Sequence, residues 1–137
     1  MDIIPPGQPF HGEFASGDAS APALETDARI KLYKEGTATE ITALGINDQV
    51  IITDYNSQLA STVTVSMFFG ATKAVTAGNL VHKVGHAASG QSQISVSFST
   101  PYKGPVGAGG IPWPKILTSA AGQVDVQIRG TIVRVGS

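Results

Sequence analysis

The chain has 137 residues, a formal net charge of −1 and no cysteine, and only 14% of its residues are charged. This length fits one compact domain. The near-neutral charge disfavours a nucleic-acid partner, which needs a basic face, and the lack of cysteine excludes disulfides, thiol catalysis and zinc sites built on thiolates. No apolar run is long enough for a membrane helix and the N-terminus lacks the basic segment of a secretion signal, so we expect no membrane partner.

Residues 1–27 differ in character from the rest of the chain. The first 28 residues carry five acidic side chains and no Lys or Arg, whereas the remainder carries nine basic and five acidic ones. The segment is also rich in proline, which favours extended backbone, and it shows no apolar period. A disordered tail is one interpretation. The other is an extended arm that lies across a neighbouring subunit or a larger assembly, through four large apolar side chains: Ile3, Ile4, Phe10 and Phe14.

From residue 28 onward, apolar and polar residues alternate with a period of two, which is typical of strands with one buried face. Val, Ile and Thr, which favour strands, supply 36 of the 137 residues, and Gly and Pro mark frequent turns. We expect about eight strands, at residues 28–35, 38–44, 49–55, 61–69, 80–86, 92–100, 115–119 and 123–135.

This spacing of short strands, without any helical period, predicts an all-β domain over residues 28–137. An antiparallel β-sandwich of the jelly-roll type is the first choice, and an immunoglobulin-like sandwich is the second. In the last strand, the alternation of Val124 and Ile128 is not continued past Gly130. Either a bulge at Gly130 restores inward packing, or Val133 and Val135 point outward and form a subunit interface.

The sequence contains no arrangement typical of catalysis or metal binding. His82 and His86 would share one face of a strand but lie about 13 Å apart, too far to hold one metal ion. Asp48 and Asp54 are better explained as turn or surface residues than as a catalytic pair. The glycine-rich segment 104–110 lacks the Gly-Lys-Ser/Thr ending and the following helix of a phosphate-binding loop. We therefore expect no enzymatic activity, no metal and no cofactor.

The segment IPWPK at residues 111–115 holds the only tryptophan, Trp113, between two prolines. Prolines stiffen the segment, so an indole presented there would lose little entropy when it binds a sugar or a protein. Alternatively, Trp113 seals the open end of the sandwich, which is the interpretation we favour.

The stretch from about Ile46 to Val135 resembles a small jelly-roll domain of tailed-phage virion proteins. The resemblance lies in an apolar strand ending in Asp, a Thr/Val strand ending in Phe-Gly, a Gly-Asn turn, a strand ending in Ser-Thr-Pro and a closing Val/Ile strand. Here these segments read VIITDY, VTVSMFFG, AGNLVHKV, ISVSFSTP and TSAAGQVDVQIRG. Such proteins are head decoration (cement) proteins or pieces of fibres, and many are trimers, so the resemblance implies no catalytic residue.

The leading hypothesis is therefore a structural virion protein, made in the host cytoplasm and located on the capsid surface. It would be a homotrimer that binds the major capsid protein and staples capsid subunits together through its arm. The alternative is a carbohydrate- or receptor-binding module of a phage fibre or similar assembly, with its site at Trp113 and the loop 101–114.

Overall fold

The structure is a computed structural model of the chain that describes residues 7–16, 25–59, 63–70, 72, 75, 76, 78–85, 92–107, 111–119 and 124–135. These residues form one 3-10 helix, η1 (Glu25–Ala28), and nine strands. No helix among them is long and apolar enough to cross a membrane. The strands are β1 (Gln8–Ser16), β2 (Lys31–Lys34), β3 (Glu40–Ile41), β4 (Asp48–Leu59), β5 (Thr64–Phe69), β6 (Leu80–Gly85), β7 (Ser92–Lys103), β8 (Pro114–Thr118) and β9 (Val124–Arg134).

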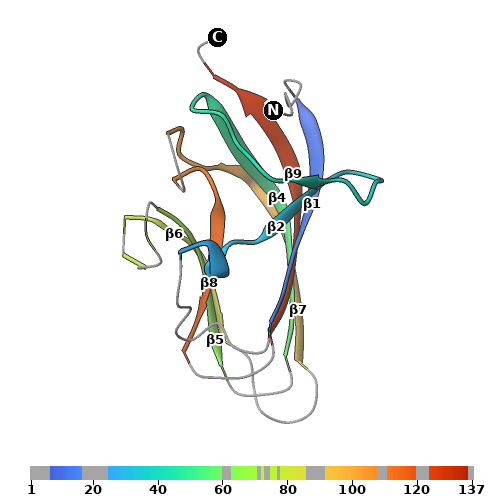
Figure 1. Cartoon of the computed structure of the whole chain (residues 1–137). Coiled ribbons are helices and arrows are strands. Elements are labelled where there is room, and N and C mark those ends of the chain that lie inside the picture. Colours follow the sequence, from blue (N-terminus) through green and yellow to red (C-terminus); the bar gives the residue numbers. More distant parts are fainter. Residues whose placement is uncertain are drawn as a thin grey trace.

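The strands form two antiparallel sheets that pack face to face (Figure 1). The large sheet has the order β3-β2-β1-β9-β4-β7, and the small sheet has the order β6-β5-β8. A single bridge between Arg29 and Lys115 joins the segment before β2 to β8, so the chain passes from one sheet to the other there. One layer thus has the order β1-β9-β4-β7, and the facing layer consists of the Arg29 segment, β8, β5 and β6. This connectivity is that of a jelly roll with two Greek keys. The predicted all-β sandwich is confirmed.

Strand β1 corrects the prediction of an N-terminal arm. All eight strands expected after residue 28 are present, but β1 adds a ninth within residues 1–27. It lies inside the large sheet, where nine of its residues pair with β9 and four pair with β2. Residues 8–16 are therefore part of the domain, because one backbone edge is paired with β9 along the whole strand and the other is paired with β2 at residues 10–13.

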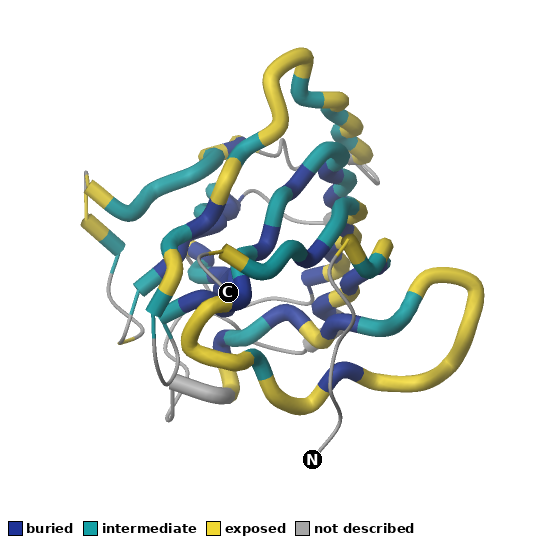
Figure 2. The backbone as a smooth tube through the Cα atoms, turned by 90° about the horizontal axis from the view of Figure 1, so that it is seen from above, coloured by how far each residue is buried: buried dark blue, intermediate teal, exposed yellow. Residues whose placement is uncertain are grey.

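The hydrophobic core lies between the two sheets. The buried residues of the described chain, drawn dark blue in Figure 2, alternate with exposed ones along the strands, as in β9. The large sheet contributes residues such as Tyr55, Phe10, Ile52 and Ile128, and the small sheet contributes residues such as Met67, Phe69 and Ile116.

A bulge lies in β4 rather than at Gly130 in β9. Strand β9 keeps its alternation, and Ile132 packs inward with 1% of its surface exposed. The register shifts in β4 instead. Ile52 pairs with Gly130 and Asp54 pairs with Arg129, so Thr53 between them is the extra residue. A Cβ atom on Gly130 would lie 1.8 Å from the carbonyl oxygen of Ile51, so the bulged strand requires glycine there.

Candidate functional site

The outer face of the large sheet is hollowed into a groove with a volume of about 640 Å³. Strands β1, β9, β4 and β7 form its floor, and the turn between β2 and β3 forms a wall on the β1 side. This is the face turned away from the core, where an antiparallel sheet normally carries polar side chains. The lining residues are His11, Gly12, Glu13, Glu35, Gly36, Thr37, Ala38, Asp54, Tyr55, Asn56, Ser95, Val96, Ser97, Gln127, Ile128 and Arg129.

The strand register brings the polar lining residues into two parallel rows, which we call the floor. Each row takes one residue from each of four neighbouring strands, and every neighbouring pair is in direct register. With about 4.8 Å between strands, a row of four residues spans roughly 14 Å. The first row is His11, Arg129, Asp54 and Ser97, and the second row is Glu13, Gln127, Asn56 and Ser95.

The β4 bulge places Asp54 in the first row. Val50 and Ile52 point into the core, and unbroken alternation would send Asp54 inward after them. The extra residue Thr53 reverses the alternation, so that Tyr55 is buried and Asp54 lines the groove. Bulges are common next to functional sites because they re-aim a side chain in this way.

Hydrogen bonds fix the β4 side of the floor. The Asp54 carboxylate accepts one hydrogen bond from the Ser97 hydroxyl at 2.8 Å and another from the Thr53 hydroxyl at 2.9 Å. In the second row, the side-chain amide of Asn56 donates to the Ser95 hydroxyl. Each Asp54 oxygen keeps a further lone pair, so the fixed carboxylate can still accept hydrogen bonds from a ligand.

The β1 and β9 side of the floor carries three exposed polar side chains: Arg129, Gln127 and Glu13. None of them makes a side-chain hydrogen bond or ion pair within the described part of the chain. The guanidinium and the amide can donate, and the carboxylate and the amide oxygen can accept. The floor therefore offers donors and acceptors side by side to a bound molecule.

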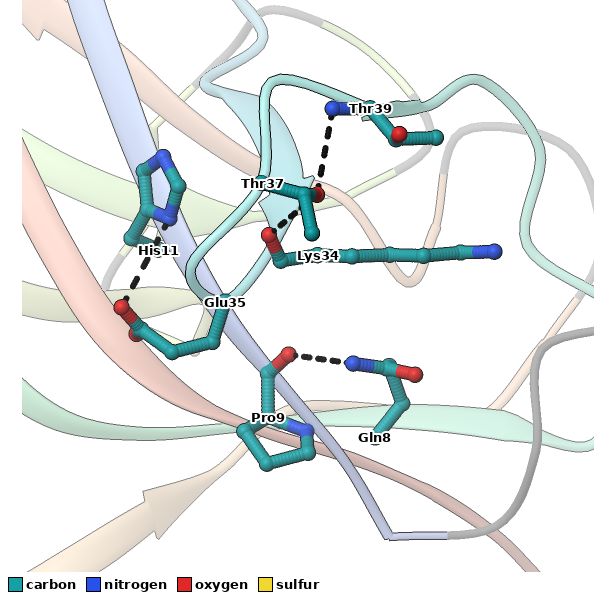
Figure 3. Close-up of polar contacts among 7 residues, drawn as sticks. All are labelled: Gln8, Pro9, His11, Lys34, Glu35, Thr37 and Thr39. Atoms are coloured by element: carbon teal, nitrogen blue, oxygen red, sulfur yellow. Dashed lines mark hydrogen bonds and ion pairs between the residues drawn. The ribbon is translucent and has the colours of Figure 1, made fainter.

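The wall is a tight turn held by its own hydrogen bonds (Figure 3). The Thr37 amide donates to the Lys34 carbonyl at 3.0 Å, and Gly36 between them has a φ of 75°, which favours glycine. The Thr37 hydroxyl donates to the same carbonyl at 2.8 Å and accepts from the Thr39 amide. The Glu35 amide donates to the Pro9 carbonyl of β1, so the turn is anchored to the sheet.

His11 stands where the wall meets the floor. Its ring stacks on Tyr33 with 5.4 Å between ring centroids and 16° between planes. Its Nδ1 lies 3.9 Å from a carboxylate oxygen of Glu35 in the wall (Figure 3), a contact that becomes an ion pair when the imidazole is protonated. Both contacts restrict the orientation of the ring at the edge of the groove.

Two of the four predicted arm residues, Phe10 and Phe14, are not available to bind a partner. Phe10 is completely buried and Phe14 is 6% exposed, and both belong to the core of the sandwich. The prediction that they bind a capsid or a neighbouring subunit is therefore wrong, because their apolar surface is already covered by the chain itself. Ile3 and Ile4 lie outside the described residues.

Trp113 is also a core residue. It is 6% exposed and belongs to the core cluster, with the Arg29 guanidinium 5.2 Å from its ring centroid. The expectation of a ligand contact at this indole is wrong, and the favoured interpretation, a side chain that seals the sandwich, agrees with its burial.

Val133 and Val135 lie off the core face, at one end of the large sheet. Val133 is half-buried opposite Gln49, and Val135 is 42% exposed with its amide donating to the Asn47 carbonyl. The other large exposed apolar side chains of the described residues are Ile46 and Val106. Ile46 precedes Asn47, and Val106 follows Gly104, whose amide binds the Val50 carbonyl. All of them therefore lie near the start of β4, and we call Ile46, Val106 and Val135 the apolar end.

Among the residues that the structure describes, no three His, Cys, Asp or Glu side chains converge to form a set of metal ligands. The sequence interpretation of Asp48 as a turn residue is confirmed, because its carboxylate accepts the Gly45 amide at 2.7 Å. The interpretation of Asp54 as a turn or surface residue did not predict that it lines the groove. The available signal was the change of phase between Val50, Ile52 and Tyr55, which marks the bulge.

No protein-family model, characterised protein or solved structure matches the chain.

Proposed function

We propose that the chain is a non-catalytic binding module of a phage fibre or a similar assembly, which attaches to a carbohydrate or receptor through the groove. The observation that carries this proposal is the floor, where a bulge aims Asp54 into a row with Arg129 and His11. A polar outer face is ordinary in a sandwich, but a hollow with a fixed wall and side chains left open for contact is what a binding site requires.

The proposal predicts that attachment depends on the floor. The full chain, displayed in many copies on beads, is expected to bind the surface of bacterial cells from a panel of species. The double substitution Asp54→Ala with Asn56→Ala removes the fixed floor groups of β4 and should abolish this binding. Asp125→Ala is the matched control, because Asp125 is exposed on β9, on the same face but outside the groove. Equal binding by both variants would contradict the proposal.

The apolar end favours a second function, that of a capsid decoration protein. Exposed Ile46, Val106 and Val135 gather at one end of the sandwich, and burying them against the major capsid protein or a second copy of this chain would be favourable. A protein bound only to the assembled head stabilises it by mass action. This function uses the end of the sandwich in place of an arm, and it suits the homotrimer that the resemblance implies.

The test of the second function compares phage heads assembled with and without this chain. Heads that carry it are expected to burst at a higher temperature. Ile46→Ser together with Val135→Ser should prevent the chain from co-sedimenting with heads, whereas Asp125→Ala should leave co-sedimentation unchanged. Heads of equal thermal stability with and without the chain would argue against decoration.

A further inference from the structure

We infer that the ligand of the groove is a neutral oligosaccharide that lies across the strands. This inference rests on the proposed function and names the class of ligand for the same site. Three properties of the groove lead to it: the absence of large apolar groups on the floor, the excess of acidic over basic groups, and the placement of donors beside acceptors.

The polarity of the floor argues against a protein ligand. Protein interfaces derive most of their affinity from large apolar and aromatic side chains near the centre of the contact. The large apolar residues of the lining, Tyr55, Val96 and Ile128, lie on the inward phase of their strands, and Tyr55 and Ile128 are buried. The outward side chains of the floor include no apolar or aromatic group except the His11 ring, and the large exposed apolar residues of the described chain lie at the apolar end. A protein bound in the groove would therefore find little apolar surface to cover.

The charges in the groove argue against an acidic ligand. Glu13, Glu35 and Asp54 bring three carboxylates to the lining, against one guanidinium from Arg129 and the imidazole of His11. Phosphate, uronate or sialate groups would approach these carboxylates at short range, where like charges disfavour binding. The same charges disfavour a nucleic-acid strand, whose binding relies on basic residues.

The donor and acceptor pattern matches hydroxyl groups. A sugar hydroxyl donates one hydrogen bond and accepts others, so it pairs best with a carboxylate on one side and an amide or guanidinium on the other. Arg129 lies in register with Asp54, and Gln127 lies in register with Glu13. Because Asp54, Asn56 and the wall are already fixed by hydrogen bonds, little ordering entropy opposes binding.

The test uses electrophoresis of the full chain in native gels that contain a soluble polysaccharide. Dextran, a galactomannan and a β-glucan are the neutral probes, and polygalacturonate is the acidic one. We expect at least one neutral probe to retard the protein, with no retardation by polygalacturonate. Gln127→Ala and Arg129→Ala each remove a donor and should weaken the retarding interaction by roughly tenfold, which corresponds to one lost hydrogen bond with a charged or polar partner. Asp125→Ala should migrate as the unchanged chain does.

The outcomes separate this inference from the proposed function. Retardation by polygalacturonate alone, lost in Arg129→Ala, would overturn a neutral ligand and leave the groove as the binding site. If no probe retards the protein but cell binding depends on Asp54 and Asn56, the inference of a neutral oligosaccharide would be overturned and the proposed binding module would be retained. Equal retardation of the Gln127, Arg129 and Asp125 variants would show that the polysaccharide binds outside the groove and would overturn this inference, while cell binding by the Asp54 and Asn56 variant would still decide the proposed function. Circular dichroism spectra of all variants establish that the substitutions leave the fold intact.

Discussion

At the scale of single residues, Tyr55 and His82 place two polar atoms in the space between the sheets. Tyr55 is 2% exposed, and its ring meets the His82 ring edge to face with centroids 4.8 Å apart. Among the residues that the structure describes, neither the Tyr55 hydroxyl nor His82 Nε2 has a full hydrogen bond. Burial raises the pKa of Tyr55, although the nearby Ser57 hydroxyl partly offsets the rise, and burial lowers the pKa of His82.

The lowered pKa of His82 predicts a loss of stability in mild acid. The unfolded chain takes up a proton at His82 near its ordinary pKa of 6.5, whereas the folded chain resists until the pH is lower. Folding is therefore favoured fully above pH 6.5, and the free energy of unfolding falls as the pH drops from 6.5 toward the folded-state pKa. Urea denaturation at about pH 7.5 and about pH 5.5 should show this fall, and His82→Phe should reduce it. An equal fall in the variant would assign the effect to other groups.

The buried hydroxyl of Tyr55 gives a complementary prediction. Tyr55→Phe removes a buried polar atom that has no full hydrogen bond and only a weak interaction with the Ser57 side chain, so the free energy of unfolding should stay within about 1 kcal/mol of its original value. A thermal or urea denaturation series measures it. A loss of about 2 kcal/mol or more would show instead that the hydroxyl is hydrogen-bonded, for example through a buried water molecule.

At the scale of elements, the ladder between β4 and β9 determines both the fold and the groove. The bulge at Thr53 turns Asp54 outward, and it depends on the close approach of the Ile51 carbonyl to Gly130. Gly130→Ala should therefore lower the free energy of unfolding by at least about 3 kcal/mol, since backbone must move to admit the methyl group. For a domain of this size, the Tm should fall by roughly 10 °C.

Gly85→Ala is the matched control for Gly130→Ala. Gly85 also lies in a strand, but no atom of the described residues lies within 4 Å of a Cβ atom added there, and its φ is not positive. Its Tm should change little or rise slightly. If Gly130→Ala retained the original Tm, the requirement for glycine at the contact between β9 and β4 would be contradicted.

Sequence periodicity located every strand whose inward residues are large. Strands Thr64–Phe69 and Val124–Arg134 form where they were predicted, and the expected break in alternation at Gly130 is absent, because Ile132 continues the inward series of the last strand. The sequence pattern did not predict strand β1, because Gly12 interrupts its series of inward apolar residues between Phe10 and Phe14. Glycine is needed there, since a Cβ atom would lie 2.9 Å from the Ile128 and Leu32 side chains. The prolines of this segment also argued against a strand. Pro9 is tolerated in β1 because it lies beyond the end of the ladder with β2, where no backbone N–H is needed on that side.

The groove was less accessible to sequence reasoning than the strands. Its floor joins residues from β1, β9, β4 and β7, which are as far apart in the chain as His11 and Arg129. Their meeting depends on strand order and register, and a shift of one residue would send Asp54 to the core. Periodicity identifies which residues face outward, but it does not say which outward residues become neighbours.

At the scale of the whole molecule, the beginning and the end of the described chain form one structural unit. β1 runs beside β9 along its full length, and its other edge carries the hairpin that forms the wall of the groove (Figure 1). A virion protein that staples capsids by an N-terminal arm would fold without that arm. This chain instead uses residues 8–16 to complete its larger sheet, so Phe10 and Phe14 are not free to reach another subunit.

Deletion of residues 1–16 should therefore prevent folding. The truncated chain would expose the edges of β9 and β2 and leave the core without Phe10 and Phe14, which are both buried. We expect a broad, non-cooperative thermal transition by circular dichroism, and restoration of a sharp one when a synthetic peptide of residues 7–16 is added, because an extended peptide can complete an open sheet edge. A truncated chain with the original Tm would reinstate the arm. Unfolding of the truncated chain would also abolish capsid binding for a trivial reason, so the Ile46 and Val135 substitutions, which leave β1 in place, are the decisive test of decoration.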